Sequence, residues 1–247
     1  MTGRRRATIP AVWYRYSPDR KGEHPQAHLR GFRGILQADA YSGYAPLYAS
    51  GEIVEAACWA HARRKFYDLY VADRSPIATE AIQRIGALYA IEREIRGSHP
   101  AQRASVRQQR AGPLLDALQQ WLSATLQTVS AKSELAGAIR YSLVRWTALT
   151  RYRDDGRIEI DNNSAERSIR PLVLGRRNYM FAGSDVGGER AANIYSLIGT
   201  ALLNTMDPYL YLRHVFERIA EHRINRIDEL LPWNVAATLP DDRRQAA

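Results

Sequence analysis

The stretch that decides the fold class is residues 35–44, Ile-Leu-Gln-Ala-Asp-Ala-Tyr-Ser-Gly-Tyr. Its apolar start predicts a short strand, Asp39 ends that strand, and the Tyr, Ser and Gly residues turn the chain away. A second apolar run, Ile53 to Trp59, leads directly into a helical segment over residues 61–66. Strands that alternate with helices predict an α/β fold, in which functional groups tend to lie where strands end. Asp39 is therefore a candidate site residue, although an aspartate in such a place is more often a turn former.

The segments before and after these elements have different patterns of apolar residues. Residues 11–16, Ala-Val-Trp-Tyr-Arg-Tyr, combine aromatic and β-branched side chains and predict an earlier strand. Residues 76–152 instead carry apolar side chains at helical spacing and predict an all-helical block. Its first helix begins at Pro76, with Ser75 as the N-cap. The other two cover about residues 102–127 and 133–152.

The last third of the chain returns to shorter elements. After a turn signal at residues 154–156, Asp161 or Asn162 caps a short helix that carries Glu166. We expect a further helix over about residues 187–204, with Ala191, Ile194, Tyr195, Ile198 and Leu202 facing inward. Another helix runs from Pro208 to about His222, and residues 227–233 pack as a terminal hook.

Composition and charge narrow the class of protein. The 247 residues are 45% hydrophobic and 25% charged, which excludes disorder as the main state. No apolar run approaches the length of a membrane span and no secretory signal opens the chain, so we expect a cytoplasmic protein without a membrane partner. The net charge is +9, and almost all of the positively charged side chains are arginines. This charge fits a nucleic-acid partner and equally fits an arginine-rich coding bias.

One acidic residue lies among several arginines. Glu166 is close in sequence to Arg167, Arg170, Arg176 and Arg177. By default a glutamate early in a helix forms a surface ion pair and favours the helix dipole. A carboxylate pair that binds Mg²⁺ beside arginines that bind phosphates is, however, the arrangement that phosphodiester hydrolysis or transfer requires.

Several runs together resemble the signature of the insertion sequence 66 family of bacterial DDE transposases. The strongest is residues 161–167, Asp-Asn-Asn-Ser-Ala-Glu-Arg, followed by Arg-Pro at 170–171, Gly-Arg-Arg-Asn at 175–178 and Phe-Ala-Gly-Ser at 181–184. Supporting runs are residues 36–44, 58–66 and 195–201, and the closing element comprises residues 207–208, 211–212 and 228–233. The resemblance extends from about residue 12 to residue 235, in the expected order.

The resemblance implies an α/β fold that is mostly helical: an incomplete RNase H-like core interrupted by a large helical insertion. It implies that Asp39 and Glu166 are catalytic acids and Mg²⁺ ligands, with Mn²⁺ as a substitute, in DNA strand cleavage and transfer. The implied partners are insertion-sequence ends, target DNA, and a second copy or full-length transposase. The DNA-binding candidates are Arg63, Arg64, Lys65, Arg167, Arg170, Arg176 and Arg177.

The expected segments follow from this resemblance. They are a basic disordered leader (1–10), partial core strands with the second acid (11–66), the helical insertion (67–155), the return of the core with the third acid (156–204), a C-terminal helical element (205–237) and a disordered tail (238–247).

One departure from the family pattern concerns the first catalytic aspartate, which the family carries on an early strand. Asp19 is the sole aspartate before Asp39, and it follows the strand predicted at residues 11–16. We therefore expect an N-terminally truncated chain that holds two of three acids, binds Mg²⁺ poorly and cleaves little DNA. The alternative is an inactive remnant that binds DNA or transposase, and a basic scaffold unrelated to DNA is a third class.

Other conspicuous residues have structural interpretations. Cys58 and His61 have half the spacing of a zinc site, but Cys58 is the single cysteine, so packing or a place near substrate is favoured for His61. Trp121 and Trp146 lie on apolar helical faces and are expected in the core.

Overall fold

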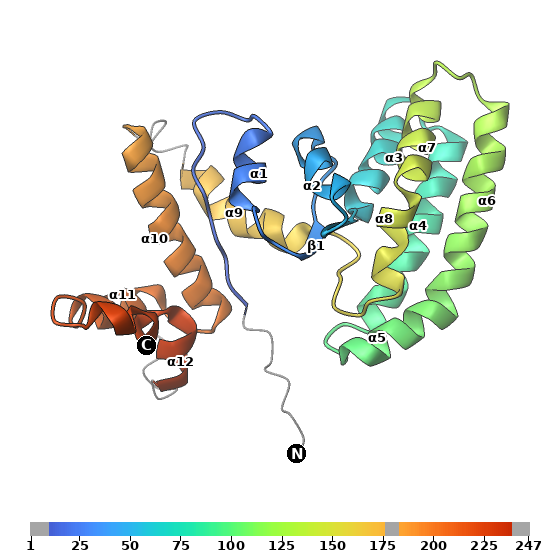
Figure 1. The fold of residues 1–247 in the computed structure, drawn as a ribbon. Coiled ribbons are helices and arrows are strands. Elements are labelled where there is room, and N and C mark those ends of the chain that lie inside the picture. Colours follow the sequence, from blue (N-terminus) through green and yellow to red (C-terminus); the bar gives the residue numbers. More distant parts are fainter. Residues whose placement is uncertain (1–9, 176–182, 239–247) are drawn as a thin grey trace. The chain divides into compact units, whose positions relative to one another are not determined.

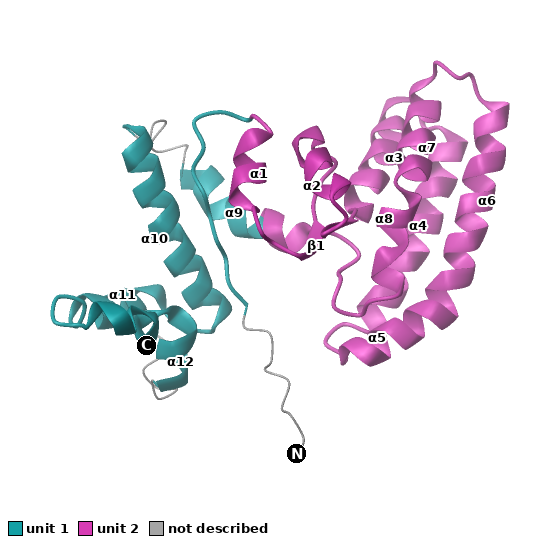
Figure 2. Ribbon diagram, in the orientation of Figure 1, with its two compact units in different colours: residues 1–20, 167–247 teal, residues 21–166 magenta. Residues whose placement is uncertain are grey.

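The computed structural model describes residues 10–175 and 183–238. Most of these residues are helical, and two short strands form a parallel sheet (Figure 1). The chain divides into two compact units, residues 21–166 and residues 1–20 with 167–247 (Figure 2). Within the described ranges, no helix combines the length and apolar character that a membrane span needs.

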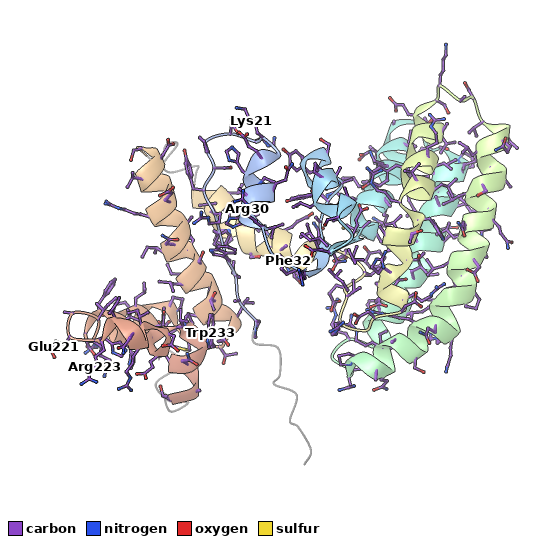
Figure 3. The ribbon with its side chains drawn as sticks, in the orientation of Figure 1. Lys21, Arg30, Phe32, Glu221, Arg223 and Trp233 are labelled. Atoms are coloured by element: carbon purple, nitrogen blue, oxygen red, sulfur yellow. The ribbon has the colours of Figure 1, made fainter. Side chains whose placement is uncertain are left out.

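The sheet in the unit of residues 21–166 confirms two predicted strands. Strand β1 (Gly34–Gln37) pairs in parallel with β2 (Ile53–Ala56), with Gly34 opposite Ile53 and Gln37 opposite Ala56. Helix α1 (Glu23–His28) precedes the sheet, and Figure 3 shows Lys21 and Arg30 near its two ends. The 3₁₀ turn η1 (Ser42–Tyr44) and α2 (Ala45–Ala49) make the crossover that parallel strands require.

The helical block follows β2, as predicted. Its elements are α3 (Trp59–Asp73), α4 (Pro76–Glu94), α5 (Pro100–Val106), the π-helical turn η2 (Arg107–Ala111), α6 (Gly112–Thr128), α7 (Glu134–Val144), α8 (Trp146–Thr150) and η3 (Arg151–Arg153). The predicted cap of α4 is confirmed, because the Ser75 hydroxyl accepts a hydrogen bond from the amide of Ala78 at 3.3 Å. The helix predicted over residues 102–127 is interrupted at η2, where the backbone widens to π geometry.

The core of this unit lies between the helices. Trp59 and Phe66 of α3 are fully buried, together with Leu88, Leu115 and Ile139 from the neighbouring helices. The Trp59 indole donates to the carbonyl of Leu149 at 2.8 Å, so its polar atom is satisfied. Trp121 and Trp146 pack against this core, as expected from the sequence.

A buried ion pair joins the helical block to the chain that leaves it. Arg107, in η2, is fully buried, and its guanidinium donates to both Glu92 oxygens at 2.8 and 2.7 Å. The same guanidinium donates to the carbonyls of Tyr152, Asp155 and Ile158 at 2.8, 3.2 and 3.0 Å. Of its five donated bonds, two hold Glu92 and three hold carbonyls of η3 and of the segment that follows it.

Two further contacts hold the same segment. Arg103, one turn before Arg107, makes a bidentate contact with Glu159 at 2.7 and 2.8 Å. Gly156 packs so tightly that an added Cβ would lie 1.8 Å from the carbonyl oxygen of Pro100. The segment therefore has one permitted path across the start of α5.

The second unit is built from the remaining helices. Helix α9 (Asn163–Gly175) continues into it from the first unit and is followed by α10 (Asp185–Leu203), α11 (Pro208–Phe216), η4 (Ile224–Leu230) and α12 (Pro232–Thr238). Its small core comprises Ala201, Met206, Tyr211, Val215, Leu230 and Val235. Glu221 and Arg223 lie between α11 and η4, and Trp233 belongs to α12 (Figure 3).

The strand predicted at residues 11–16 is wrong. This segment is extended but pairs with helix α10 instead of a strand. Val12 exchanges hydrogen bonds with the Thr200 hydroxyl at 3.0 and 3.1 Å, and the amide of Tyr14 donates to Ser196 at 2.8 Å. Hydroxyl groups one helical turn apart therefore take the place of a neighbouring strand.

Other details of the second unit also differ from expectation. Ile194 and Leu202 of α10, predicted to face inward, are exposed at 42% and 57%. The helix predicted from Pro208 to His222 ends at Phe216. The leader and tail expected to be disordered lie outside the described residues, apart from Pro10 and Thr238.

Replacing Arg107 with Met should destabilise the protein strongly. The substitution leaves Glu92 buried and removes the donors of three carbonyls, so the free energy of unfolding should fall by about 3–5 kcal/mol. Chemical denaturation measures this value. Arg110→Met, which breaks an exposed pair with Glu94, is the matched control and should unfold close to the wild type. Equal losses for the two variants would contradict the role of Arg107.

Replacing Gly188 with Ala should destabilise the second unit. Glycine to alanine inside a helix normally stabilises it by about 1 kcal/mol, but here the new Cβ would lie 2.3 Å from the ring of Tyr16. We expect a lower melting temperature and faster tryptic cleavage at Arg15. Asn193→Ala, an exposed change on the same helix, is the control. A melting temperature above that of the wild type would show that residues 10–16 do not lie on α10.

Candidate functional site

The ends of the two parallel strands define one edge of the sheet. Asp39 lies two residues after β1, and Cys58 lies two residues after β2, immediately before α3. Because parallel strands end on the same side, the residues that follow them meet at that edge. His61, in the first turn of α3, belongs to the same edge.

The chain that returns from the helical block is bound along this edge. The Gln37 side chain donates to the carbonyl of Glu159 at 2.6 Å, and the amide of Trp59 donates to the carbonyl of Ile160 at 3.1 Å. The amide of Asn162 donates to the Cys58 sulfur at 3.5 Å. Contacts with the last residue of β1 and with the residues that follow β2 therefore place the start of α9.

Asp161 fixes the first turn of α9. Its carboxylate accepts from the Asn163 amide at 3.1 Å and from the Asn163 side chain at 2.8 Å, an Asx turn that satisfies the first amide of the helix. The Tyr89 hydroxyl of α4 donates to the same carboxylate at 3.0 Å. Burial, reinforced by the charge of Asp161, raises the pKa of Tyr89, so this hydroxyl remains a donor at neutral pH.

Glu166 lies against His61. The Glu166 Oε1 is 3.5 Å from the Nε2 of His61, and both side chains are partly accessible to solvent. The other ring nitrogen of His61, Nδ1, is buried and has no hydrogen-bond partner in the described part of the chain. The contact brings an acid from α9 to the edge at which Asp39 leaves β1.

Asp39 is exposed, and its carboxylate makes one weak contact, with the amide of Tyr41 at 3.4 Å. Burial raises the pKa of the neighbouring Tyr44, and the charge of Asp39 adds to the shift. Two accessible carboxylates at one edge are donors that fit Mg²⁺, which prefers oxygen ligands and keeps several waters. Among the described residues, no three His, Cys, Asp or Glu side chains converge into a metal-binding group.

The sequence-predicted basic residues fall into three groups. On α3, Arg64 is exposed, Arg63 stacks over Tyr67 at 5.8 Å, and Lys65 lies 4.6 Å from the ring centre of Tyr141. Arg167 and Arg170 are exposed on α9. Arg176 and Arg177 lie outside the described residues.

The structure gives Asp161 and Cys58 contacts that the sequence alone did not indicate. The predicted cap residue Asp161 proves to be the residue that joins α9 to α4, because Tyr89 reaches it. Tyr89 has no separate sequence signal, since it fits the apolar periodicity of its helix. Cys58 is buried and accepts from the Asn162 amide, which supports packing as its role.

Cys58 should react slowly with thiol reagents in the folded protein. Burial raises its pKa, so the reactive thiolate is scarcer at any given pH than for a free cysteine. With Ellman's reagent, the folded chain should react far more slowly than the chain in denaturant. The rate of the folded chain should increase only as the pH rises above about 8.5, the ordinary pKa of the thiol. The single cysteine makes the signal unambiguous. Equal rates in the two states would show that the Cys58–Asn162 contact is open.

Comparison with known proteins assigns the family. Uncharacterized protein y4hP of Sinorhizobium fredii (strain NBRC 101917 / NGR234) is 44% identical, over 91% of this chain and 44% of that protein. Uncharacterized protein y4qI of the same organism is 42% identical, over 91% of this chain and 43% of that protein. The chain thus spans less than half the length of these relatives. No solved structure matches it.

Two family models account for almost the whole chain. The model described as Transposase IS66 family matches residues 1–190, and the one described as IS66 C-terminal element matches residues 196–233. The second match covers the last part of α10, all of α11 and η4, and the start of α12, and it includes every residue of the small core of the second unit except Val235. On these matches, the chain belongs to the IS66 transposase family.

Proposed function

We propose that this chain carries two acids of a Mg²⁺-dependent DDE transposase site, Asp39 and Glu166, and acts in cleavage and transfer of DNA strands. The observation that carries the proposal is the placement of Glu166 against His61 at the edge where Asp39 follows β1. The family assignment supports DNA as the substrate class.

Mg²⁺, when bound, stabilises the attacking and leaving oxygens of an in-line phosphodiester displacement. The protein's own part is to present the carboxylates of Asp39 and Glu166 and to hold them in place. His61 restrains the Glu166 side chain, and Asp161 restrains the helix that carries it. Arg63, Arg64, Lys65, Arg167 and Arg170 supply positive charge for the phosphates, and Arg176 and Arg177 extend this set in sequence.

The proposal includes a third acid from outside these residues. The described part of the chain holds no cluster of three potential metal ligands, and the relatives are more than twice as long as the matched region. A first aspartate contributed by the further sequence of such a relative would complete the site. Joining two DNA ends also requires at least two copies, so a homo-oligomer is part of the proposal.

Metal binding by this chain should depend on both acids. Titration with Mn²⁺, followed by calorimetry, should show weak binding that Asp39→Asn and Glu166→Gln each reduce by about tenfold or more. Asp68→Asn removes an exposed carboxylate from α3 and should leave the affinity unchanged. Equal affinity for all four proteins would contradict the assignment of Asp39 and Glu166.

Strand cleavage should separate the complete site from the incomplete one. With Mn²⁺ and a plasmid that carries the ends of the insertion sequence, a full-length relative such as y4hP should nick DNA, and replacing its residue at the position of Glu166 with Ala should abolish nicking. This chain alone should bind the same DNA and cleave it little. Robust nicking by this chain that Glu166→Ala abolishes would overturn the need for a third acid. Binding without cleavage by both proteins would favour the alternative, a catalytically inactive DNA- or transposase-binding role.

A further inference from the structure

Two cations share one tyrosine ring on the surface between α3 and α7. The Lys65 Nζ lies 4.6 Å from the ring centre of Tyr141, and the Arg145 guanidinium carbon lies 4.5 Å from the same centre. Helices α3 and α7 pack against each other, so the arrangement is part of the fold of this unit. The face of a tyrosine ring attracts each cation, but the two cations repel one another.

Neither cation has an acidic partner in the described part of the chain. Other arginines of the same unit do: Arg84 pairs with Glu80, Arg103 with Glu159 and Arg110 with Glu94. Lys65 is exposed and Arg145 is partly exposed, so each cation is accessible to an anion from solvent. Two positive charges held on one ring without a carboxylate form a place where an anion would be stabilised.

The pair of cations lies near the candidate acidic site. Lys65 is one helical turn after His61 and lies on the same face of α3. Burial raises the pKa of Tyr141; Arg145 opposes the shift, whereas the charges of Asp39 and Glu55 add to it. The charge of Asp39 therefore reaches the ring that holds both cations.

We propose that Lys65, Tyr141 and Arg145 form a subsite for a backbone phosphate of the DNA strand that is processed at Asp39 and Glu166. The proposal rests on the proposed function and extends it, because it gives α7, a helix of the helical block, a direct role in DNA binding. The Arg145 guanidinium suits bidentate contact with a phosphate, Lys65 adds a point charge, and the Tyr141 ring holds both in place.

Equilibrium DNA binding by the full chain tests the subsite. The probes are a fluorescein-labelled single strand and a duplex of arbitrary sequence, measured by anisotropy between about 50 and 200 mM salt. Lys65→Gln and Arg145→Gln should each weaken binding and lower the slope of log affinity against log salt by about 0.9 on duplex and about 0.7 on single strands. Arg145→Lys should retain most of the slope, and Tyr141→Phe, which keeps the ring, should retain all of it.

Arg140→Gln is the matched control, since Arg140 is exposed on α7 next to Tyr141 but is not on its ring. Unchanged slopes for Lys65→Gln and Arg145→Gln, or an equal loss for Arg140→Gln, overturn the subsite. An unchanged slope also removes Lys65 from the proposed phosphate contacts, while the proposed metal site at Asp39 and Glu166 stands. A wild-type chain whose DNA binding does not depend on salt overturns both. Thermal melts verify folding, and the exposed Lys65→Gln carries the test if Arg145→Gln unfolds.

Discussion

The unit of residues 21–166 depends on one buried guanidinium. Arg107 donates to Glu92 and to three carbonyl groups, one in η3 and two in the chain between η3 and α9. A buried ion pair is weak evidence for net stability, because desolvation offsets most of the attraction. The contact instead affects the course of the backbone over residues 152–158. This segment pairs with no strand among the described residues, so the guanidinium supplies the hydrogen-bond donors that its carbonyls need. Within this unit, the contact helps to set the path of residues 152–158, from which the chain continues toward Glu166.

Local sequence signals located most helices and both strands, because these elements are encoded by periodicity and caps. Ser75 and Pro76 start α4 as expected, and Ser133 caps α7 in the same way. The strand prediction at residues 11–16 was wrong for a specific reason. Alternating side chains predict an extended backbone with one buried face, but they do not say what covers it. Here hydroxyl groups of α10 do so, and nothing in the segment itself distinguishes them from a strand.

The candidate acids could be named from the family resemblance, but the contact of Glu166 with His61 could not be derived from the sequence. Glu166 reaches His61 because Gln37, Trp59 and Cys58 bind backbone atoms of residues 159–162. Backbone acceptors and donors leave no trace in residue type, so such contacts are invisible to motif analysis. Arg107 was equally hidden: it stands between Arg103 and Arg110 in a run that resembles a solvated helix face, and residue type alone does not show that this arginine is buried.

The positively charged side chains of the described residues fall into two groups, those that pair with carboxylates and those that do not. Much of the positive charge is used within the protein, since Arg84, Arg103, Arg107, Arg110 and Arg153 all pair with carboxylates. Those residues cannot bind phosphate without first giving up a partner. The net charge is therefore a poor guide to a DNA footprint, and the useful distinction is between paired and unpaired cations. Lys65 and Arg145 are unpaired within the described residues and are held by one ring, so local geometry identifies them where the total charge could not.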